Sequence, residues 1–255
     1  MKEFLGIGGY TRAPEGFFSW QHLTFVTSLM IVMTVLAVVI GRSHKNQTLA
    51  GKNRPLLAAA ILIDCFEIFK IVICCMRNGW SGITLNLPLF LCSIQLITIP
   101  MAALCKGRLK EASLDFVMIF GILGAVAGTY GAAQNYGCYP VLSMDNVVSG
   151  ITHAISGFAS LYIAISGMAS MKKKNIWITF TILFGFCVAA YAANILLDYN
   201  YMFLMGGDGT PYEIVYSMVG GSKVLYPLSV VVLFLIYIVS YYGVFYLVTH
   251  KKAKV

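Results

Sequence analysis

The sequence predicts an all-α polytopic membrane protein, a bundle of seven transmembrane helices in which residues 1–255 form one domain. Composition is the first reason: 59% of the 255 residues are hydrophobic and 11% are charged, whereas soluble domains contain roughly 45–50% apolar and about 25% charged residues. The second reason is the recurrence of apolar stretches near the ~20 residues that cross a bilayer core. The third is an uneven distribution of Lys and Arg between the two sides of these stretches.

The predicted spans follow from the length and the flanks of each apolar stretch. The first follows a segment that contains Gly, Arg and Glu and carries no cleavage signal, so we expect a retained helix. The fourth is the shortest, and its Gly-Ile-Leu-Gly-Ala-Val-Ala-Gly run predicts close packing against neighbouring helices. The odd number of spans and the lack of obvious internal repeats give no support for a transporter of two inverted halves. In order, the spans are 18–40, 55–75, 87–105, 114–130, 148–171, 176–197 and 224–248.

The distribution of cations predicts the orientation, because Lys and Arg near the ends of spans are retained in the cytoplasm. Thirteen of them lie on one side, namely Arg42, Lys45, Lys52, Arg54, Lys106, Arg108, Lys110, Lys172, Lys173, Lys174, Lys251, Lys252 and Lys254. Four lie on the other side, namely Lys2, Arg12, Arg77 and Lys223. We therefore expect a multi-pass protein of the cell membrane with its N-terminus outside and its C-terminus in the cytoplasm.

Several classes of protein are disfavoured by the same inventory. The net charge is +8, but the cations form short clusters between apolar runs, which argues against a nucleic-acid partner. The seven cysteines are an odd number without CxxC or Cys/His spacing, so neither a disulfide scaffold nor a zinc finger is expected. The last span lacks the Lys that a retinal Schiff base needs. There is no P-loop or Rossmann fingerprint, and we expect no cofactor.

Charged side chains inside the second span are the clearest functional signal, because each costs at least ~2.5–3.5 kcal/mol in hydrocarbon on insertion scales. Asp64, Glu67 and Lys70 follow one another at three-residue spacing on one broad helical face, so Glu67 can meet either neighbour. Two interpretations stay open. The residues form either a self-neutralising seam that fixes helix packing or part of a substrate cavity.

Polar groups from several spans fall at one estimated depth, about 6–8 Å below the outer boundary at 1.5 Å rise per residue. They are Cys92, His153, His22, Lys70, Asn194 and Asp198. Because polar side chains in spans face the bundle interior, they predict a polar chamber in the outer leaflet. Two His residues fall short of the three that a ceramidase-type zinc site needs, although Asp198 or Cys92 could complete a set. We expect no metal.

A thiol beside an imidazole is the minimum for nucleophilic acyl transfer, since the imidazole removes the thiol proton and sulfur then carries the acyl group. Cys92 and His153 are that pair, with His22 as a second candidate base. The alternative is that Cys92 is a small apolar core residue and that His153 bonds a backbone or carboxylate partner. On the outer side, the Gly-Gly-Asp-Gly-Thr-Pro run at 206–211 is a set of turns, either a connector or a lid.

Short motifs resemble a known family. Leu87–Ile94 (LPLFLCSI), His153 in Gly-Ile-Thr-His, and 200–204 (NYMFL) with Pro211 downstream are similar to the YwaF-like bacterial integral membrane proteins and to the eukaryotic transmembrane protein 164 acyltransferases. The resemblance covers nearly the whole chain in span count and motif order. It implies a seven-span fold and transfer of an acyl chain between phospholipids, with Cys92 as nucleophile and His153 as base. The family segment often reads Leu-Pro-x-His-x-Cys, and Phe90 stands at the His position here.

The predicted function is therefore a membrane lipid acyltransferase that works from the outer leaflet through a Cys92 thioester. Its partners are membrane phospholipids. The alternative is a non-enzymatic lipid or small-molecule transporter, in which Asp64, Glu67 and Lys70 form a coupling or gating seam. The residues assigned to substrate contact are His22, Lys70, Gln95, Asn194, Asp198, Asn200 and Tyr201.

Overall fold

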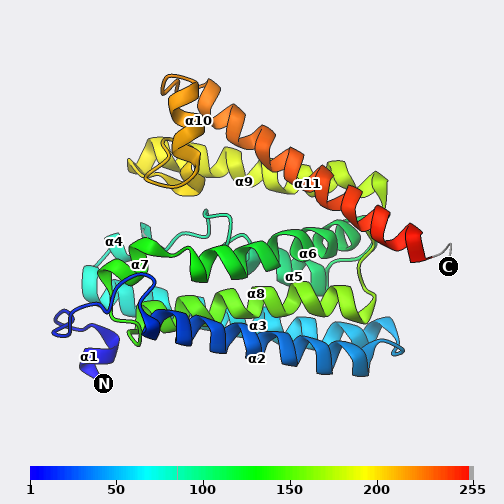
Figure 1. Cartoon of the computed structure of the whole chain (residues 1–255), viewed down its shortest axis with the longest axis horizontal. Helices are drawn as coiled ribbons and strands as arrows, with labels where there is room; N and C mark the ends of the chain where they lie inside the picture. The colour runs from blue at the N-terminus through cyan, green and yellow to red at the C-terminus, as the bar shows by residue number, and fades with distance from the viewer. Residues whose placement is uncertain (85, 253–255) are drawn as a thin grey trace. The chain divides into compact units, whose positions relative to one another are not determined.

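The computed structural model describes residues 1–84 and 86–252, and every regular element of this described part is a helix (Figure 1). The helices fall into two compact units. Unit 1 comprises Met1–Leu87 and Gln95–Ala169, and unit 2 comprises Pro88–Ile94 and Ser170–Val255. The side chains of Lys251, Lys252 and Lys254, which belong to the predicted cytoplasmic cations, lie outside the described part.

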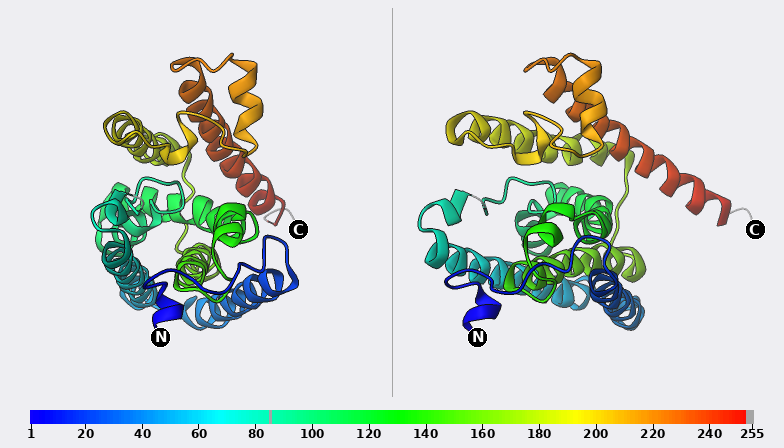
Figure 2. Two further views of the ribbon diagram at one scale, coloured as in Figure 1. Left: turned by 90° about the vertical axis from the view of Figure 1, so that its left-hand side faces the viewer. Right: turned by 60° about the vertical axis from the view of Figure 1, so that its left-hand side comes forward.

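Unit 1 is organised around α8, which contacts α2, α3 and α6; a short helix, α5, packs against α3 and α6 (Figure 2). Polar residues begin three of the long helices. The hydroxyls of Ser19, Thr48 and Ser143 each accept a hydrogen bond from the backbone N–H three residues later, which satisfies a donor that the first turn leaves unpaired. The helices are α1 (Lys2–Leu5), α2 (Trp20–His44), α3 (Leu49–Asn78), α4 (Ser81–Thr84), α5 (Gln95–Leu104), α6 (Gly107–Tyr130), α7 (Ala133–Cys138) and α8 (Met144–Ser166).

Small residues let α6 and α8 approach closely, as the small-residue run in the fourth span predicts. A Cβ added at Gly121 would lie 2.6 Å from the carbonyl oxygen of Ser156. The hydroxyl of Ser160 donates a 2.6 Å hydrogen bond to the carbonyl oxygen of Met118 on the facing helix. Such contacts between small residues and between hydroxyl and carbonyl groups are how helices associate in lipid, where no hydrophobic force draws them together.

Unit 2 is built on α9 and α11, which contact each other, with α10 packed on α11 (Figure 1). Buried hydroxyls join its elements. The Thr179 and Tyr242 hydroxyl oxygens lie 3.2 Å apart between α9 and α11, and the Tyr226 hydroxyl donates to the carbonyl oxygen of Phe203 at 2.7 Å. The elements are η1 (Lys173–Asn175), α9 (Ile176–Leu197), η2 (Tyr201–Phe203), α10 (Tyr212–Met218) and α11 (Leu225–Lys252).

Five helical segments of the described chain are long and apolar enough to cross a membrane. They overlap five of the seven predicted spans, and they run over Trp20–His44, Gly107–Cys138, Met144–Ser166, Lys173–Leu197 and Leu225–Thr249. The second predicted span corresponds to α3, whose 30 residues extend about 45 Å but carry charged side chains. These five segments support a multi-pass membrane protein.

The third predicted span, 87–105, is not a continuous helix. Its helical part is α5, which has 10 residues and so extends only about 15 Å. Residues 86–94 form turns. The prediction of a helical Cys92 at a depth set by the helical rise is therefore wrong, because the hydropathy of a stretch does not reveal where the helical hydrogen-bond ladder stops.

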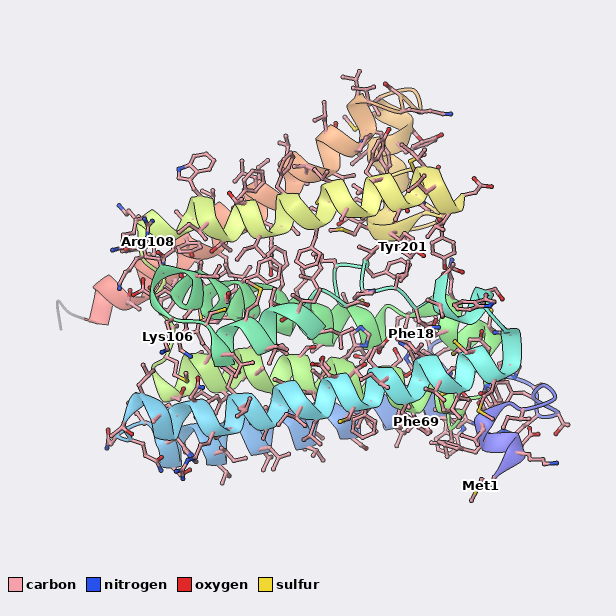
Figure 3. The ribbon with its side chains drawn as sticks, turned by 180° about the vertical axis from the view of Figure 1, so that it is seen from behind. Met1, Phe18, Phe69, Lys106, Arg108 and Tyr201 are labelled. Atoms are coloured by element: carbon pink, nitrogen blue, oxygen red, sulfur yellow. The ribbon has the colours of Figure 1, made fainter. Side chains whose placement is uncertain are left out.

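An ion pair joins α3 to α8 at the end of unit 1 that carries the N-terminal segment; Figure 3 shows Phe18 at this end and Lys106 at the opposite end. Two guanidinium nitrogens of Arg77 donate to the two carboxylate oxygens of Asp145 at 2.7 and 2.8 Å. The Tyr10 hydroxyl donates to the same carboxylate at 2.5 Å. Burial and this hydrogen bond raise the pKa of Tyr10 to about 12, so the hydroxyl keeps its proton at physiological pH.

The Arg77–Asp145 pair predicts a large stability effect. The two side chains are only 10% and 13% exposed, and removing one partner of a buried pair costs about 3–5 kcal/mol because the other charge stays buried. We expect Asp145→Ala to lower the free energy of unfolding in detergent by about 3 kcal/mol. The control is Arg12→Ala, which breaks a pair exposed to 54% and 19% and should cost less than about 1 kcal/mol. Equal losses would contradict the prediction.

Candidate functional site

Cys92 lies in the turns that precede α5, in a segment assigned to unit 2. It is half-buried, and its Sγ lies 4.0 Å from the Ser93 hydroxyl oxygen. Irregular backbone at membrane depth is tolerated only where protein or a water-filled cavity satisfies its polar groups. Cys92 thus lies in turns, whereas Cys74 and Cys187 are buried within helices.

Phe90 anchors this segment within unit 2. Its ring centroid lies 6.2 Å from that of Tyr199, 5.4 Å from that of Tyr201 and 6.4 Å from that of Phe203. The two tyrosine contacts are edge-to-face, the arrangement that the charge distribution of aromatic rings favours. Phe90, at the position where the resembled motif often has His, thus packs the Cys92 segment against the turn that follows α9.

Asn194 and Asp198 shape that turn. The Asn194 carboxamide accepts a 2.6 Å hydrogen bond from the Tyr201 backbone N–H and donates a 3.1 Å bond to the Tyr201 carbonyl oxygen. Asp198 ends α9 in a left-handed conformation, with φ at 50°. Figure 3 shows Tyr201 in the segment after α9. The polar atoms of Asn194 are therefore occupied by backbone groups, which favours a structural role over the predicted substrate contact.

Asn200 holds the following loop in the same way. Its amide nitrogen donates to the carbonyl oxygen of Gly206 at 2.9 Å and to an Asp208 carboxylate oxygen at 2.8 Å, and its oxygen accepts from the Met205 N–H at 2.8 Å. Met202, inside this loop, has φ at 56°, a conformation that disfavours non-glycine residues. Strained backbone persists only where surrounding contacts determine it, and the Asn200 hydrogen bonds are such contacts.

His153 of α8 is oriented by its own helix and by α6, both in unit 1. Its Nδ1 lies 2.7 Å from the Ser149 carbonyl oxygen. Because a carbonyl oxygen only accepts, Nδ1 carries the proton of the neutral ring and Nε2 has the lone pair. Gly128 makes room for the ring: a Cβ there would lie 2.0 Å from Nε2. Sequence reasoning missed Gly128 and Ser149, although the small-residue run and the four-residue spacing to His153 are visible signals.

His22 is fully buried, and both of its ring nitrogens meet backbone groups. Nδ1 accepts from the Phe18 N–H at 3.1 Å, and Nε2 lies 3.1 Å from the Thr129 carbonyl oxygen, to which it donates. The ring also packs 3.9 Å from the Tyr136 ring, measured between centroids. These contacts tie the segment before α2 to α6, and they favour a structural His22 over a second base.

The α3 charges form a local pair. Lys70 Nζ lies 2.6 Å from a Glu67 carboxylate oxygen, so Glu67 meets Lys70, one of the two partners that its spacing allows. Asp64 lies one helical turn before Glu67 and is half-buried. Gln95, at the first position of α5, is fully buried, and its carboxamide oxygen accepts from the Thr98 hydroxyl at 3.1 Å.

The predicted site residues are divided between the two units. Unit 1 contains His22, Asp64, Glu67, Lys70, Gln95 and His153, and unit 2 contains Cys92, Asn194, Asp198, Asn200 and Tyr201. Within unit 2, aromatic contacts bring the Cys92 segment to Tyr201. In the part of the chain that the structure describes, no three His, Cys, Asp or Glu side chains are placed to hold a metal ion.

The contact between Gly128 and His153 predicts a substitution effect. Gly128→Ala should displace the imidazole and lower the free energy of unfolding by about 1–3 kcal/mol, the typical cost of overpacking. Gly185→Ala in α9 is the matched control, since a Cβ there meets nothing within 4 Å and Ala favours a helix. Thermal unfolding of both variants in detergent measures the difference. An unchanged Gly128→Ala protein would show that the imidazole can move aside freely.

Comparison with known proteins confirms one part of the resemblance, the similarity to the transmembrane protein 164 family. The model of the TMEM164 family matches residues 17–248, which is most of the chain. No curated protein and no solved structure matches it. With a family match over this length and five helical segments able to cross a membrane, the chain is a multi-pass membrane protein that belongs to the TMEM164 family.

Proposed function

We propose that this protein is a lipid acyltransferase of the cell membrane, which moves an acyl chain between phospholipids through a thioester on Cys92. The orientation of His153 carries the proposal. Its Nδ1 is held by the Ser149 carbonyl oxygen, so Nε2 is the nitrogen free of a proton, as a general base requires. A backbone carbonyl at Nδ1 is a common means of setting the tautomer of a working histidine.

The position of Cys92 gives separate support. A nucleophile must be reached by substrate, and Cys92 is half-buried in turns between α4 and α5, not enclosed within a helix. An acyl chain is apolar and its ester is polar, so a nucleophile in an irregular stretch of an otherwise apolar sequence suits a lipid ester. Phe90 and its tyrosine contacts hold this stretch in place, which limits the motion of the thiol.

The reaction proceeds in two steps. His153 Nε2 takes the Cys92 proton, and the thiolate attacks the carbonyl carbon of a phospholipid ester. The bond between that carbon and the glycerol oxygen breaks, and the departing oxygen takes the proton from the imidazolium. A lysophospholipid hydroxyl, deprotonated by His153, then attacks the thioester and releases the Cys92 thiolate, which takes the proton back from the imidazolium. The mechanism requires Cys92 Sγ and His153 Nε2 to approach within hydrogen-bond reach during turnover.

The proposal includes the seven-span topology with the N-terminus outside. Two of the seven spans are irregular. The second is α3, in which the Glu67–Lys70 pair offsets part of the penalty for charge in hydrocarbon. The third is the turn-and-helix stretch 87–105, whose interrupted helix resembles those that form binding sites in other membrane proteins.

A second candidate function is transport of a lipid or small molecule without covalent chemistry. The Glu67–Lys70 pair favours it, because paired ionisable groups on a membrane helix are typical of coupling and gating sites. Asp64, one turn away, would extend this seam. The two candidates differ in the residue on which activity depends.

Thioester formation separates the two functions. Incubation with a phospholipid that carries a labelled acyl chain should label Cys92, because covalent catalysis holds the chain on sulfur between capture and release. Cys92→Ser and His153→Ala should abolish both the label and the remodelled lipid. Mass spectrometry of the protein and of the lipids measures both.

Glu67→Gln provides the contrast. In an acyltransferase it should leave the Cys92 thioester detectable, whereas in a transporter it should abolish movement of substrate while Cys92→Ser remains active. Cys187→Ser is a matched thiol control, because Cys187 is buried within α9. Full lipid remodelling by a stably folded Cys92→Ser protein would overturn the proposed function.

The proposed orientation has a direct test. In a background with the native cysteines replaced, a Cys at Met218, which is 80% exposed, should react with a membrane-impermeant maleimide in intact cells. A Cys at exposed Lys45 should react only after permeabilisation, because the distribution of Lys and Arg predicts that its loop is cytoplasmic. A fluorescent reporter fused after Val255 should be cytoplasmic. The reverse labelling pattern would contradict this topology.

A further inference from the structure

A small cavity lies at the end of unit 1 that carries the N-terminal segment. Its volume is about 180 Å³, below the ~300–1,000 Å³ of pockets that hold drug-sized ligands. The cavity therefore has room for the headgroup of a lipid and not for its acyl chains. Its lining comes from the N-terminal segment and from the residues just before α8, all in unit 1. The lining residues are Glu3, Phe4, Tyr10, Arg12, Pro140, Leu142 and Ser143.

One anionic and one cationic side chain line this cavity. Arg12 forms an ion pair with Glu15 at 3.0 Å, but a guanidinium has five N–H donors, so donors remain for an anion in the cavity. One oxygen of the Glu3 carboxyl group accepts from the backbone N–H groups of Thr11 and Arg12 at 3.0 and 3.2 Å. The bond from the Arg12 N–H lowers the pKa of Glu3, so the group is a carboxylate at neutral pH.

Hydrogen bonds hold the two walls of the cavity together. The Tyr10 hydroxyl donates to the Asp145 carboxylate of α8 at 2.5 Å. The Glu15 carboxylate accepts from the Val141 backbone N–H at 2.7 Å. Both bonds cross from the N-terminal segment to residues at the start of α8, so the charged groups are positioned before a ligand arrives. Such preorganisation lowers the entropic cost of binding.

The remaining lining is aromatic or apolar. Phe4 and Tyr10 supply two aromatic rings, and Pro140 and Leu142 supply aliphatic surface. Aromatic faces attract ammonium groups, and guanidinium groups are well suited to bind phosphate. The combination matches a ligand in which a phosphate and an ammonium group are joined by a short carbon chain.

Exposed aromatic side chains mark the level of the membrane surface at this end of unit 1. Trp20, the first residue of α2, is 73% exposed, and Trp80, just after α3, is 85% exposed. Figure 3 shows Phe18, which is also exposed, at the same end. Tryptophan is enriched where the hydrocarbon of a bilayer meets water. The cavity therefore lies at the level of the lipid headgroups.

We propose that this cavity binds the zwitterionic phosphoamine headgroup of a membrane phospholipid, with the phosphate at Arg12 and the ammonium group at Glu3. The rings of Phe4 and Tyr10 add to the binding of the ammonium group. An anionic headgroup fits less well, because it brings no cation to Glu3. The inference goes beyond the proposed acyl transfer and does not depend on it, since that chemistry uses no residue of the cavity.

Lipid binding to the full-length protein in detergent micelles tests the site. The probes are dihexanoyl phosphatidylethanolamine, phosphatidylglycerol with the same acyl chains, and soluble O-phosphoethanolamine, each titrated by calorimetry. We expect phosphatidylethanolamine to bind at least about tenfold more tightly than phosphatidylglycerol, because only the former provides a cation for Glu3. Equal affinity for these two lipids would overturn the inference.

O-phosphoethanolamine distinguishes the two sources of the headgroup, because it has the same charged groups without acyl chains. Tighter binding of the lipid would support the site and assign it to a membrane phospholipid. Equal binding of the two would also support the site and assign it to a soluble phosphoamine. Failure of both to bind would overturn the inference.

Three variants place the binding in the cavity. Glu3→Gln keeps an oxygen that can accept the two backbone N–H groups and removes the charge, and Arg12→Gln removes the cation. Each should raise the Kd for phosphatidylethanolamine at least about tenfold, as expected for loss of a charge-assisted hydrogen bond. Leu142→Trp, at an exposed position, should fill the cavity and abolish binding. Lys2→Gln removes a cation that does not line the cavity, and this matched control should bind like the wild type.

The melting temperature of each variant without lipid verifies that it is folded. Wild-type affinity in Leu142→Trp and in both charge variants would overturn the inference, because the lipid would then bind elsewhere. Equal weakening by Lys2→Gln and Arg12→Gln would also overturn it, since general surface charge would explain the binding. Cys92→Ser should bind the headgroup with the wild-type Kd although it transfers no acyl chain, so the cavity and the proposed function can fail separately.

Discussion

The close approach of α6 and α8 is the constraint on which unit 1 depends. Gly121 and Gly128 present bare backbone to α8, and side chains there would overlap Ser156 and His153. On α8, a Cβ at Gly157 would lie 2.2 Å from the Met33 sulfur of α2. Three helices thus meet where small residues remove the steric barrier, and lipid-embedded helices gain dispersion energy from such contact. The orientation of His153 is a product of this packing.

A second constraint acts on the backbone between α4 and α5. Within an apolar environment each unpaired N–H or C=O is costly, so a break in a helix must be compensated nearby. The Ile94 N–H bonds the Phe90 carbonyl oxygen at 3.1 Å, and the Phe90 ring is enclosed by aromatic side chains. The turn after α9 repeats this principle, since Asn194 and Asn200 bond backbone groups that a helix would otherwise satisfy. Irregular segments here are therefore held by side chains.

Sequence reasoning located helices well where apolar length is decisive. The predicted 176–197 span coincides with α9, and the predicted 224–248 span begins one residue before α11 and ends inside it. It misjudged 87–105, because hydropathy reports which environment a stretch prefers and not whether its backbone is helical. The Glu67–Lys70 ion pair could be predicted from the three-residue spacing. The Arg77–Asp145 ion pair could not, because its partners are 68 residues apart. No local pattern predicts which distant charges meet. The structural bonds of His22 and Asn194 were hidden for the same reason, since their partners are backbone groups brought together by folding.

The short helix α5 depends on contacts with its neighbours. A helix of 10 residues is marginal by itself, so its persistence depends on anchors. Lys110 and Asn53 anchor the C-terminal carbonyls, and packing against α3 and α6 buries Thr98, Ile99 and Ala102. These anchors hold the helix although the Gln95 Nε2 atom at its N-terminal end has no hydrogen-bond partner among the residues that the structure describes. An extended third span would enclose the Cys92 region in a continuous hydrogen-bond ladder. The interruption instead leaves Cys92 in turns, where its thiol is not enclosed by a helix.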